Sequence, residues 1–220
     1  MPYSQVPETD KTAMATAVKI CGITRVEDAL VAAHAGAHAI GMIFYAGSPR
    51  LVSHGVACRI VDVLPAFVTP VALFVDARTA EVERVISEVK PQLLQFHGDE
   101  TPEFCESFGV PYIKAAKVRQ GVDLLQYARQ YRTAKGLLLD AFVDGSHGGT
   151  GSTFDWALIP DQLPLPLILA GGLHQNNVAE AIRRVRPWAV DVSSGVEAAK
   201  GIKDAAKITA FIRGARNADV

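Results

Sequence analysis

Cys21 is a residue whose type and position suggest proton transfer. It follows the apolar residues 18–20 and lies three residues before Thr24, where a helix is predicted to begin. The dipole and free N–H groups of a helix N-terminus favour a thiolate, so Cys21 is a candidate general base. The alternative is a small buried side chain without chemistry, which is the usual fate of a free cysteine. Cys58 and Cys105 lie within predicted helices, and we expect no chemical role for either.

Two further titratable side chains end predicted strands. Asp140 closes the apolar run 136–139, where partial desolvation should raise its carboxyl pKa and retain a proton for donation. Asp140 is therefore a candidate general acid, or else it caps a turn or pairs with a basic neighbour. His97 ends the segment 93–97, and we expect it to orient another group by hydrogen bonding rather than to act as the base.

Other positions are suited to binding anions. Arg50 follows the stiff turn 47–49, where its guanidinium either holds a carboxylate through two hydrogen bonds or simply faces solvent. The candidate phosphate site follows two later strands and consists of Gly171, Gly172, Ser193, Ser194 and Gly195. Glycines let backbone N–H groups approach a phosphate closely, whereas the alternative is a pair of tight turns without a ligand. Asn176 is placed to begin the next helix.

Eight short apolar segments must position these residues. They cover 18–21, 39–45, 71–76, 93–97, 113–118, 136–141, 167–171 and 190–193. Their nearly uniform apolar composition is typical of parallel strands that are covered on both faces. Apolar residues spaced by three and four predict helices between them, most clearly over 56–64, 82–89 and 178–185.

Shorter signals mark where helices begin and end. Thr24 and Glu27 form a predicted capping box for the first helix, and Gly36 and Pro91 indicate helix ends. No linker divides the chain, so we predict one catalytic domain over 18–220 after a loose tail over 1–17.

Eight β/α units joined by right-handed crossovers can close into a TIM (β/α)8 barrel of the α/β class. We favour this barrel over an open doubly wound sheet, which usually has fewer strands. In such a barrel, active sites lie in the loops after the C-terminal ends of the strands, where the candidate residues are found. The glycine-rich segment 148–151, within the loop 142–154, is of the kind that closes over a substrate and excludes water.

A buried ion pair is also predicted. Lys19 shares a strand face with Cys21, and Asp191 shares one with Ser193, because side chains alternate along a strand. The first and last strands of a closed barrel are neighbours, so Lys19 and Asp191 can pair and help to position the site.

Composition excludes several classes of protein. With 22 basic and 23 acidic residues, the chain lacks the positive charge of a nucleic-acid-binding protein. Its 49% hydrophobic and 20% charged residues fit a globular domain. We expect no membrane span and no secretory signal, and three cysteines without a CxxC pair fit a reducing, cytoplasmic compartment. The expected partner is a small molecule, with neither nucleic acid nor membrane involved.

Together these segments resemble one family, the phosphoribosylanthranilate isomerases. The matching segments occur in family order and are 18–24, 44–45, 48–50, 95–98, 138–140, 148–151, 154–156, 170–173 and 190–197. Val26 stands where many relatives have Pro, and Ser152 where another residue often follows the glycine-rich loop. These departures concern loop closure and leave the catalytic positions intact.

The resemblance implies an enzyme of tryptophan biosynthesis without cofactor or metal. Its reaction is the Amadori rearrangement of N-(5-phosphoribosyl)anthranilate into 1-(2-carboxyphenylamino)-1-deoxyribulose 5-phosphate. The resemblance implies that Cys21 is the general base, that Asp140 is the general acid, and that Arg50 binds the anthranilate carboxylate. We further expect His97 and Asp191 to contact the substrate, and the chain to be a monomer or a homodimer.

Two other functions stay open. A phosphate-binding barrel lyase or aldolase would use a strand lysine, Lys114 or Lys117, as Schiff base or acid. A barrel that only binds a phosphate ligand would need Cys21 and Asp140 to point away from the rim. Related sugar isomerases of histidine biosynthesis use paired aspartates, so Cys21 favours the anthranilate substrate without excluding weak activity on the histidine precursor.

Overall fold

The structure is a computed structural model that describes residues 15–118, 121–141, 156–160 and 162–218. The segment 142–155, which holds the predicted glycine-rich loop and Ser152, lies outside the described residues, as do tail residues 1–14. In the described part of the chain, no helix has the length and apolar character needed to cross a membrane.

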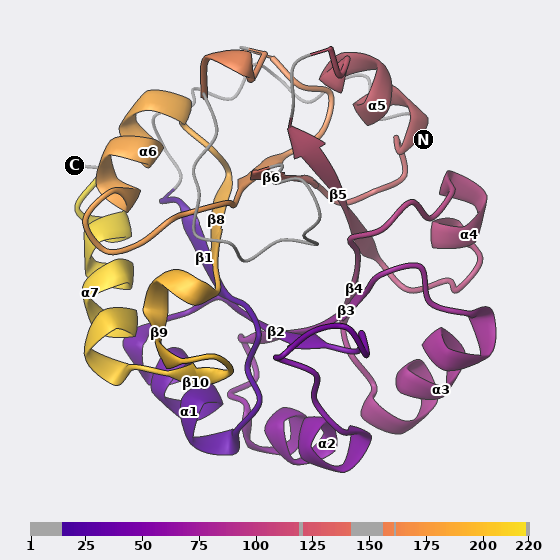
Figure 1. Ribbon diagram of the computed structural model, residues 1–220, viewed down its shortest axis with the longest axis vertical. Helices are drawn as coiled ribbons and strands as arrows, with labels where there is room; N and C mark the ends of the chain where they lie inside the picture. The colour runs from indigo at the N-terminus through magenta and orange to yellow at the C-terminus, as the bar shows by residue number, and fades with distance from the viewer. Residues whose placement is uncertain (1–14, 119–120, 142–155, 161, 219–220) are drawn as a thin grey trace.

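Eight parallel strands close into a barrel in chain order (Figure 1). They are β1 (Ala17–Ile20), β2 (Ala39–Ile43), β3 (Thr69–Phe74), β4 (Leu93–Phe96), β5 (Tyr112–Val118), β6 (Leu137–Ala141), β7 (Leu167–Leu169) and β8 (Ala189–Val192). β1 pairs with β8, with Lys19 opposite Asp191 in the register, so the sheet has no free edge. All eight predicted strands and the closed barrel are confirmed. β1 begins at Ala17, one residue before the predicted domain start.

Helices cover the outside of the barrel (Figure 1). They are α1 (Val26–Ala35), α2 (His54–Val63), α3 (Thr79–Val89), α4 (Pro102–Glu106), α5 (Leu124–Gln130), α6 (Val178–Val185) and α7 (Ala205–Arg216). Two 3-10 helices, η1 (Trp156–Leu158) and η2 (Ser194–Val196), complete the set among the described residues. The three predicted apolar stripes are confirmed as α2, α3 and α6, although α6 is preceded by Asn177 rather than Asn176 at its N-cap.

The predicted capping box at the start of α1 is wrong. Arg25 occupies the N-cap position, and no side chain makes the capping hydrogen bond there. The Thr24 hydroxyl instead donates to the carbonyl oxygen of Gly201, a residue far along the chain. The Thr24 hydroxyl therefore makes a tertiary hydrogen bond instead of the helix-capping bond that the local sequence predicted. The predicted stop at Gly36 is confirmed, because this residue is the left-handed C-cap of α1 with φ of 100°.

A hairpin of two short strands was not predicted from the sequence. It is antiparallel, consists of β9 (Glu197–Ala199) and β10 (Ile202–Lys203), follows β8 and η2, and lies beside α1 and α7 (Figure 1). The backbone N–H of Lys203 donates to Asp28 of α1, at 3.1 Å. Lys207 of α7 donates to the carbonyl oxygen of Glu197, at 2.8 Å. These contacts fix the hairpin to the helix layer next to the strand ends.

The inside of the barrel changes from apolar to polar toward the C-terminal strand ends. One buried apolar cluster inside it consists of Ile113, Ala115, Leu138, Ile168, Ala170 and Ala189. Cys21 packs in a smaller cluster with Ile43, Leu73 and Val75. Lys19, Gln95 and Asp191 are buried as well. Since side chains alternate along each strand, one inward face carries both the packing residues and the candidate site residues.

Candidate active site

A pocket of about 390 Å³, part of it open to solvent, lies at the C-terminal ends of β6, β7 and β8. It is lined by Asp140, Ala170, Gly171, Gly172, Leu173, Asp191, Val192, Ser193 and Ser194. The pocket thus brings the candidate acid together with most of the candidate phosphate site. Cys21, Arg50, His97 and Gly195 do not line it. The backbone N–H of Cys21 donates to Val192, His97 contacts Asp140, and Gly195 follows Ser194 in the chain.

The loop after β7 is shaped by two consecutive glycines. Gly171 and Gly172 have φ of 80° and 64°, in the left-handed region where residues with a Cβ are strained. Neither backbone N–H donates to another described residue. Successive N–H groups in such turns form a concave site for an anion. Gly195 serves a different purpose, because a Cβ there would collide with the carbonyl oxygen of Leu173, where the loops after β7 and β8 touch.

Cys21 lies beside a buried ion pair. The Lys19 ammonium donates to the Asp191 carboxylate at 2.8 Å, which confirms the predicted pair between β1 and β8. Gly41 of β2 makes room for both neighbours, since a Cβ there would lie 2.8 Å from Cys21 Sγ and 3.0 Å from Lys19 Nζ. Asp191 borders the pocket, so the ion pair connects the sulfur to the pocket wall.

The protonation of Cys21 differs from the sequence-based prediction. Burial raises the pKa of the Cys21 thiol, and this effect outweighs the Lys19 ammonium, which lowers it. The predicted preference for the thiolate is therefore wrong: the sulfur is buried, and α1 begins only at Val26. Although burial disfavours the charged amine, the Asp191 carboxylate and the Cys21 thiolate raise the pKa of Lys19.

Asp140 is held by a short chain of hydrogen bonds. His97 Nε2 lies 3.2 Å from Asp140 Oδ2, and His97 Nδ1 lies 3.0 Å from Gln95 Nε2. If the Gln95 amide donates to Nδ1, the N–H of the His97 ring is on Nε2 and donates to Asp140. His97 therefore contacts the candidate acid, as expected of an orienting residue. Gln95, which sequence analysis did not single out, is fully buried inside the barrel.

Arg50 is buried rather than solvated. Its Nε and Nη2 donate to the two carboxylate oxygens of Glu197, at 2.7 and 2.9 Å. The aliphatic part of the Arg50 side chain and the Ser193 hydroxyl both lie next to Gly22. A Cβ on Gly22 would lie 2.5 Å from Arg50 Cδ and 2.9 Å from Ser193 Oγ. The alternative of a surface arginine is excluded, because only 8% of Arg50 is exposed.

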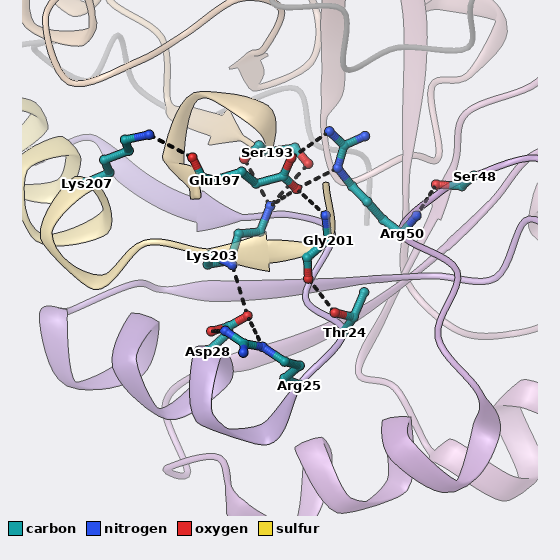
Figure 2. Close-up of polar contacts among 10 residues, drawn as sticks. All are labelled: Thr24, Arg25, Asp28, Ser48, Arg50, Ser193, Glu197, Gly201, Lys203 and Lys207. Carbon is teal, nitrogen blue, oxygen red and sulfur yellow. Dashed lines mark hydrogen bonds and ion pairs between the residues drawn. The ribbon is translucent and has the colours of Figure 1, made fainter. Parts of the chain in front are cut away.

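Lys203 completes this part of the site (Figure 2). Its ammonium donates to Glu197 at 2.9 Å, to the carbonyl oxygen of Ser193 at 2.9 Å and to the Ser193 hydroxyl at 3.4 Å. Burial lowers the pKa of Lys203, although the Glu197 carboxylate opposes that effect. Glu197 shows the reverse balance, because burial would raise its pKa but Arg50 and Lys203 together lower it.

No group of three or more His, Cys, Asp or Glu side chains in the described ranges could hold a metal ion. The polar residues gathered at the strand ends carry carboxyl, thiol, imidazole, guanidinium and hydroxyl groups, a set that is suited to proton transfer on a phosphorylated small molecule.

Comparison with known proteins decides the family. A model for N-(5'-phosphoribosyl)anthranilate (PRA) isomerase matches residues 18–214. The chain belongs to this family. The Nitrosospira multiformis PRA isomerase is 60% identical over 201 residues, which are 91% of this chain and 97% of that protein. The Azotobacter vinelandii PRA isomerase is 60% identical over 200 residues, with the same shares covered.

Solved structures of PRA isomerases share the fold. The Thermotoga maritima enzyme has a TM-score of 0.85 and 42% identity, over 92% of this chain and 99% of that one. A PRA isomerase in complex with reduced 1-(o-carboxyphenylamino)-1-deoxyribulose 5-phosphate has a TM-score of 0.81 and 41% identity, with the same coverage. The resemblance and the TIM barrel predicted from the sequence are thereby confirmed.

The two lysines of the lyase alternative occupy different places. Lys114 is fully buried, and its ammonium donates to the carbonyl oxygen of Gly98 at 2.6 Å and to Glu100 at 3.1 Å. Such a lysine has no access to a substrate carbonyl. Lys117 is half-buried, lies opposite Asp140 in the register, and shares a strand face with inward-facing Ala115.

Sequence analysis missed Gln95, Glu197 and Lys203 as contributors to the site. A signal existed for Gln95, because it is a polar residue at an inward position of an otherwise apolar strand. Glu197 was noted only as part of a family segment. No local signal marks Lys203, because only the pairing of β9 with β10 brings it next to Ser193 at the end of β8.

Proposed function

We propose that the chain is a PRA isomerase, which converts N-(5'-phosphoribosyl)anthranilate into 1-(2-carboxyphenylamino)-1-deoxyribulose 5-phosphate in tryptophan biosynthesis. The observation that carries the proposal is a single pocket joining Asp140 to the loops after β7 and β8, in a chain that belongs to this family. The substrate phosphate lies against the N–H groups of Gly171 and Gly172 and against Ser193 and Ser194.

Asp140 acts as the general acid. It donates a proton to the ring oxygen of the ribose while the bond between that oxygen and C1 breaks, and the nitrogen lone pair forms an iminium. His97 holds the Asp140 carboxyl group in place for this transfer, through the contact between Nε2 and Oδ2. A positioned acid of this kind contributes about 10²- to 10⁴-fold to the rate.

Cys21 acts as the general base. The iminium acidifies the hydrogen on C2, and the Cys21 thiolate removes it to give an enolamine. The enolamine then becomes the ketone when C1 gains a proton and the C2 hydroxyl loses one, so atoms and charge balance across the isomerisation. Because burial raises the pKa of Cys21, the active thiolate depends on the adjacent Lys19 ammonium. Asp191 keeps that ammonium in place.

Arg50 binds the anthranilate carboxylate. The aliphatic part of the Arg50 side chain lies across Gly22 from Ser193, which supports binding of the carboxylate and the phosphate by neighbouring parts of one site. A lyase that uses Lys114 as a Schiff base is disfavoured by the burial of that amine. We also propose that the protein works in the cytoplasm, because its three cysteines are all free. We further propose that it is a monomer or a homodimer, since a solved Thermotoga maritima relative is described as monomers of a dimeric enzyme.

The test is a fluorescence assay with PRA generated in the cuvette, in which loss of the anthranilate signal reports turnover. Cys21→Ala and Asp140→Asn should each lower kcat by at least about 10²-fold while the protein stays folded. Cys58→Ala is the matched control, because Cys58 lies on α2 outside the barrel, and it should retain full activity. Near-normal turnover by Cys21→Ala would refute the base assignment, and failure of the unaltered chain to consume PRA would refute the function.

A further inference from the structure

The carboxylate of Glu197 is shared by two buried cations. It accepts from Arg50 Nε at 2.7 Å, from Arg50 Nη2 at 2.9 Å and from Lys203 Nζ at 2.9 Å (Figure 2). The backbone N–H of Gly201 also approaches it, at 3.3 Å. The exposed fractions of the Arg50, Glu197 and Lys203 side chains are 10%, 6% and 0%. Water therefore screens these contacts little, and they fix the three side chains firmly.

Glu197 occupies only one edge of the Arg50 guanidinium. A guanidinium presents five N–H donors in a planar fork, and a carboxylate uses two of them. Glu197 takes the edge formed by Nε and Nη2, whereas Nη1 donates to no other described residue. Figure 2 shows this second terminal nitrogen pointing away from Glu197. Glu197 thus holds the Arg50 guanidinium in one orientation and leaves the N–H donors of its other edge for a second carboxylate.

The charges of this cluster do not balance. Arg50 and Lys203 bring two positive charges and Glu197 one negative charge, and Lys203 reaches Ser193 only through a neutral carbonyl and hydroxyl. Asp28 accepts from the backbone N–H of Lys203, and its own charge is paired with Arg25, so it does not offset the excess. A buried excess of positive charge is unfavourable, and an incoming carboxylate would neutralise it.

Lys203 links the same cluster to the pocket. Arg50 contacts Glu197, Glu197 contacts Lys203, and Lys203 contacts Ser193, which lines the pocket. We propose that Glu197 and Lys203 are positioning residues that hold Arg50 and Ser193 in a fixed relation, so that the carboxylate and phosphate ends of the substrate are bound as a unit. This proposal rests on the proposed function, because it assumes that Arg50 meets the anthranilate carboxylate.

The test compares two ligands that differ only in the ring carboxyl group. One is reduced 1-(o-carboxyphenylamino)-1-deoxyribulose 5-phosphate, and the other is the same compound made from aniline. Glu197→Gln should weaken the carboxylated ligand by about 10- to 100-fold, as expected for a misaligned charge-assisted contact. The aniline compound should change by less than about threefold. KM for PRA should rise more than kcat falls.

Lys203→Met should weaken both ligands, because Ser193 loses its contact with the ammonium. Equal weakening of both ligands by Glu197→Gln would overturn the proposal, since a purely structural role affects them alike. Tighter binding of the carboxylated ligand would overturn it too, because Glu197 would then compete with the substrate for Arg50.

Two further variants keep the test decisive. If Glu197→Gln fails to fold, the double variant Glu197→Gln/Lys203→Met keeps the same net charge and should still lose the preference for the carboxylated ligand. Arg50→Gln should abolish that preference by itself. If it does not, the role assigned to Arg50 is wrong, whereas turnover of PRA by the unaltered chain is measured independently of both results.

Discussion

Replacing Lys19 by Met should lower both the stability of the barrel and its catalytic activity, by two different effects. The Lys19 ammonium lies 2.8 Å from the Asp191 carboxylate, and the two side chains are only 6% and 9% exposed. Removing one partner of a buried pair leaves the other charge uncompensated, which costs about 3–5 kcal/mol. In a chain of 220 residues, a loss of that size lowers Tm by roughly 6–20 °C.

The same substitution should change the pH dependence of the reaction. The Lys19 ammonium opposes the burial that raises the pKa of Cys21, so Met at this position should raise that pKa further. The alkaline rise of kcat/KM should then move to higher pH, and activity at pH 7.5 should fall by about 10- to 100-fold. The measurement is PRA fluorescence from pH 6 to 10, below the unfolding temperature of the variant.

The double variant Lys19→Met/Asp191→Leu tells the two effects apart. It removes both charges and fills the space with apolar groups, so most of the lost stability should return. The rise of kcat/KM should remain at higher pH than in the unaltered protein, because Lys19 lowers the pKa of Cys21 more than Asp191 raises it. An unaltered pH profile in Lys19→Met would show that Lys19 acts on folding alone, and the reasoning would fail.

Two other substitutions test the crowding around Gly22 and the burial of the Cys105 thiol. Gly22→Ala should lower kcat/KM by at least about 10-fold, because φ is 72° and the new Cβ would lie 2.5 Å from Arg50 Cδ; Gly55→Ala, with nothing within 4 Å, should have no effect on turnover. Burial raises the pKa of Cys105 from 9.0 to about 12, so the unfolded thiol ionises first and the free energy of unfolding should fall between those pH values. Cys105→Ala should flatten this fall in urea unfolding, and an unchanged slope would contradict it.

The strand pattern could be predicted because each strand is a local signal. Uniformly apolar runs identified all eight strands, and barrel closure then made β1 and β8 neighbours. Period-two alternation placed Lys19 on the strand face of Cys21 and Asp191 on that of Ser193, and the neighbouring strands then predicted their contact, which the structure confirms. The loops predicted to bind phosphate could be chosen for the same reason, since they begin where strands end, and the structure shows that they line a pocket.

The contacts that could not be predicted join residues far apart in the chain. Arg50 and Glu197 are 147 positions apart, and Thr24 and Gly201 are 177 apart. Nothing in the local pattern around Thr24 shows that its hydroxyl meets a hairpin carbonyl instead of capping α1. The hairpin itself has strands of three and two residues, too short for an alternating pattern to be recognised.

The position of Cys21 combines two requirements that oppose each other. Burial raises the pKa of the thiol, so fewer molecules carry the thiolate at neutral pH. In the role proposed for Cys21, a thiolate with a raised pKa is also a stronger base toward the substrate C–H bond. The Lys19 ammonium lowers the pKa of the buried thiol and so stabilises the thiolate in place of water. Gly41 leaves space for both side chains. A bulkier residue at Gly41 should therefore displace the sulfur or the ammonium, and should reduce turnover even where the barrel stays folded.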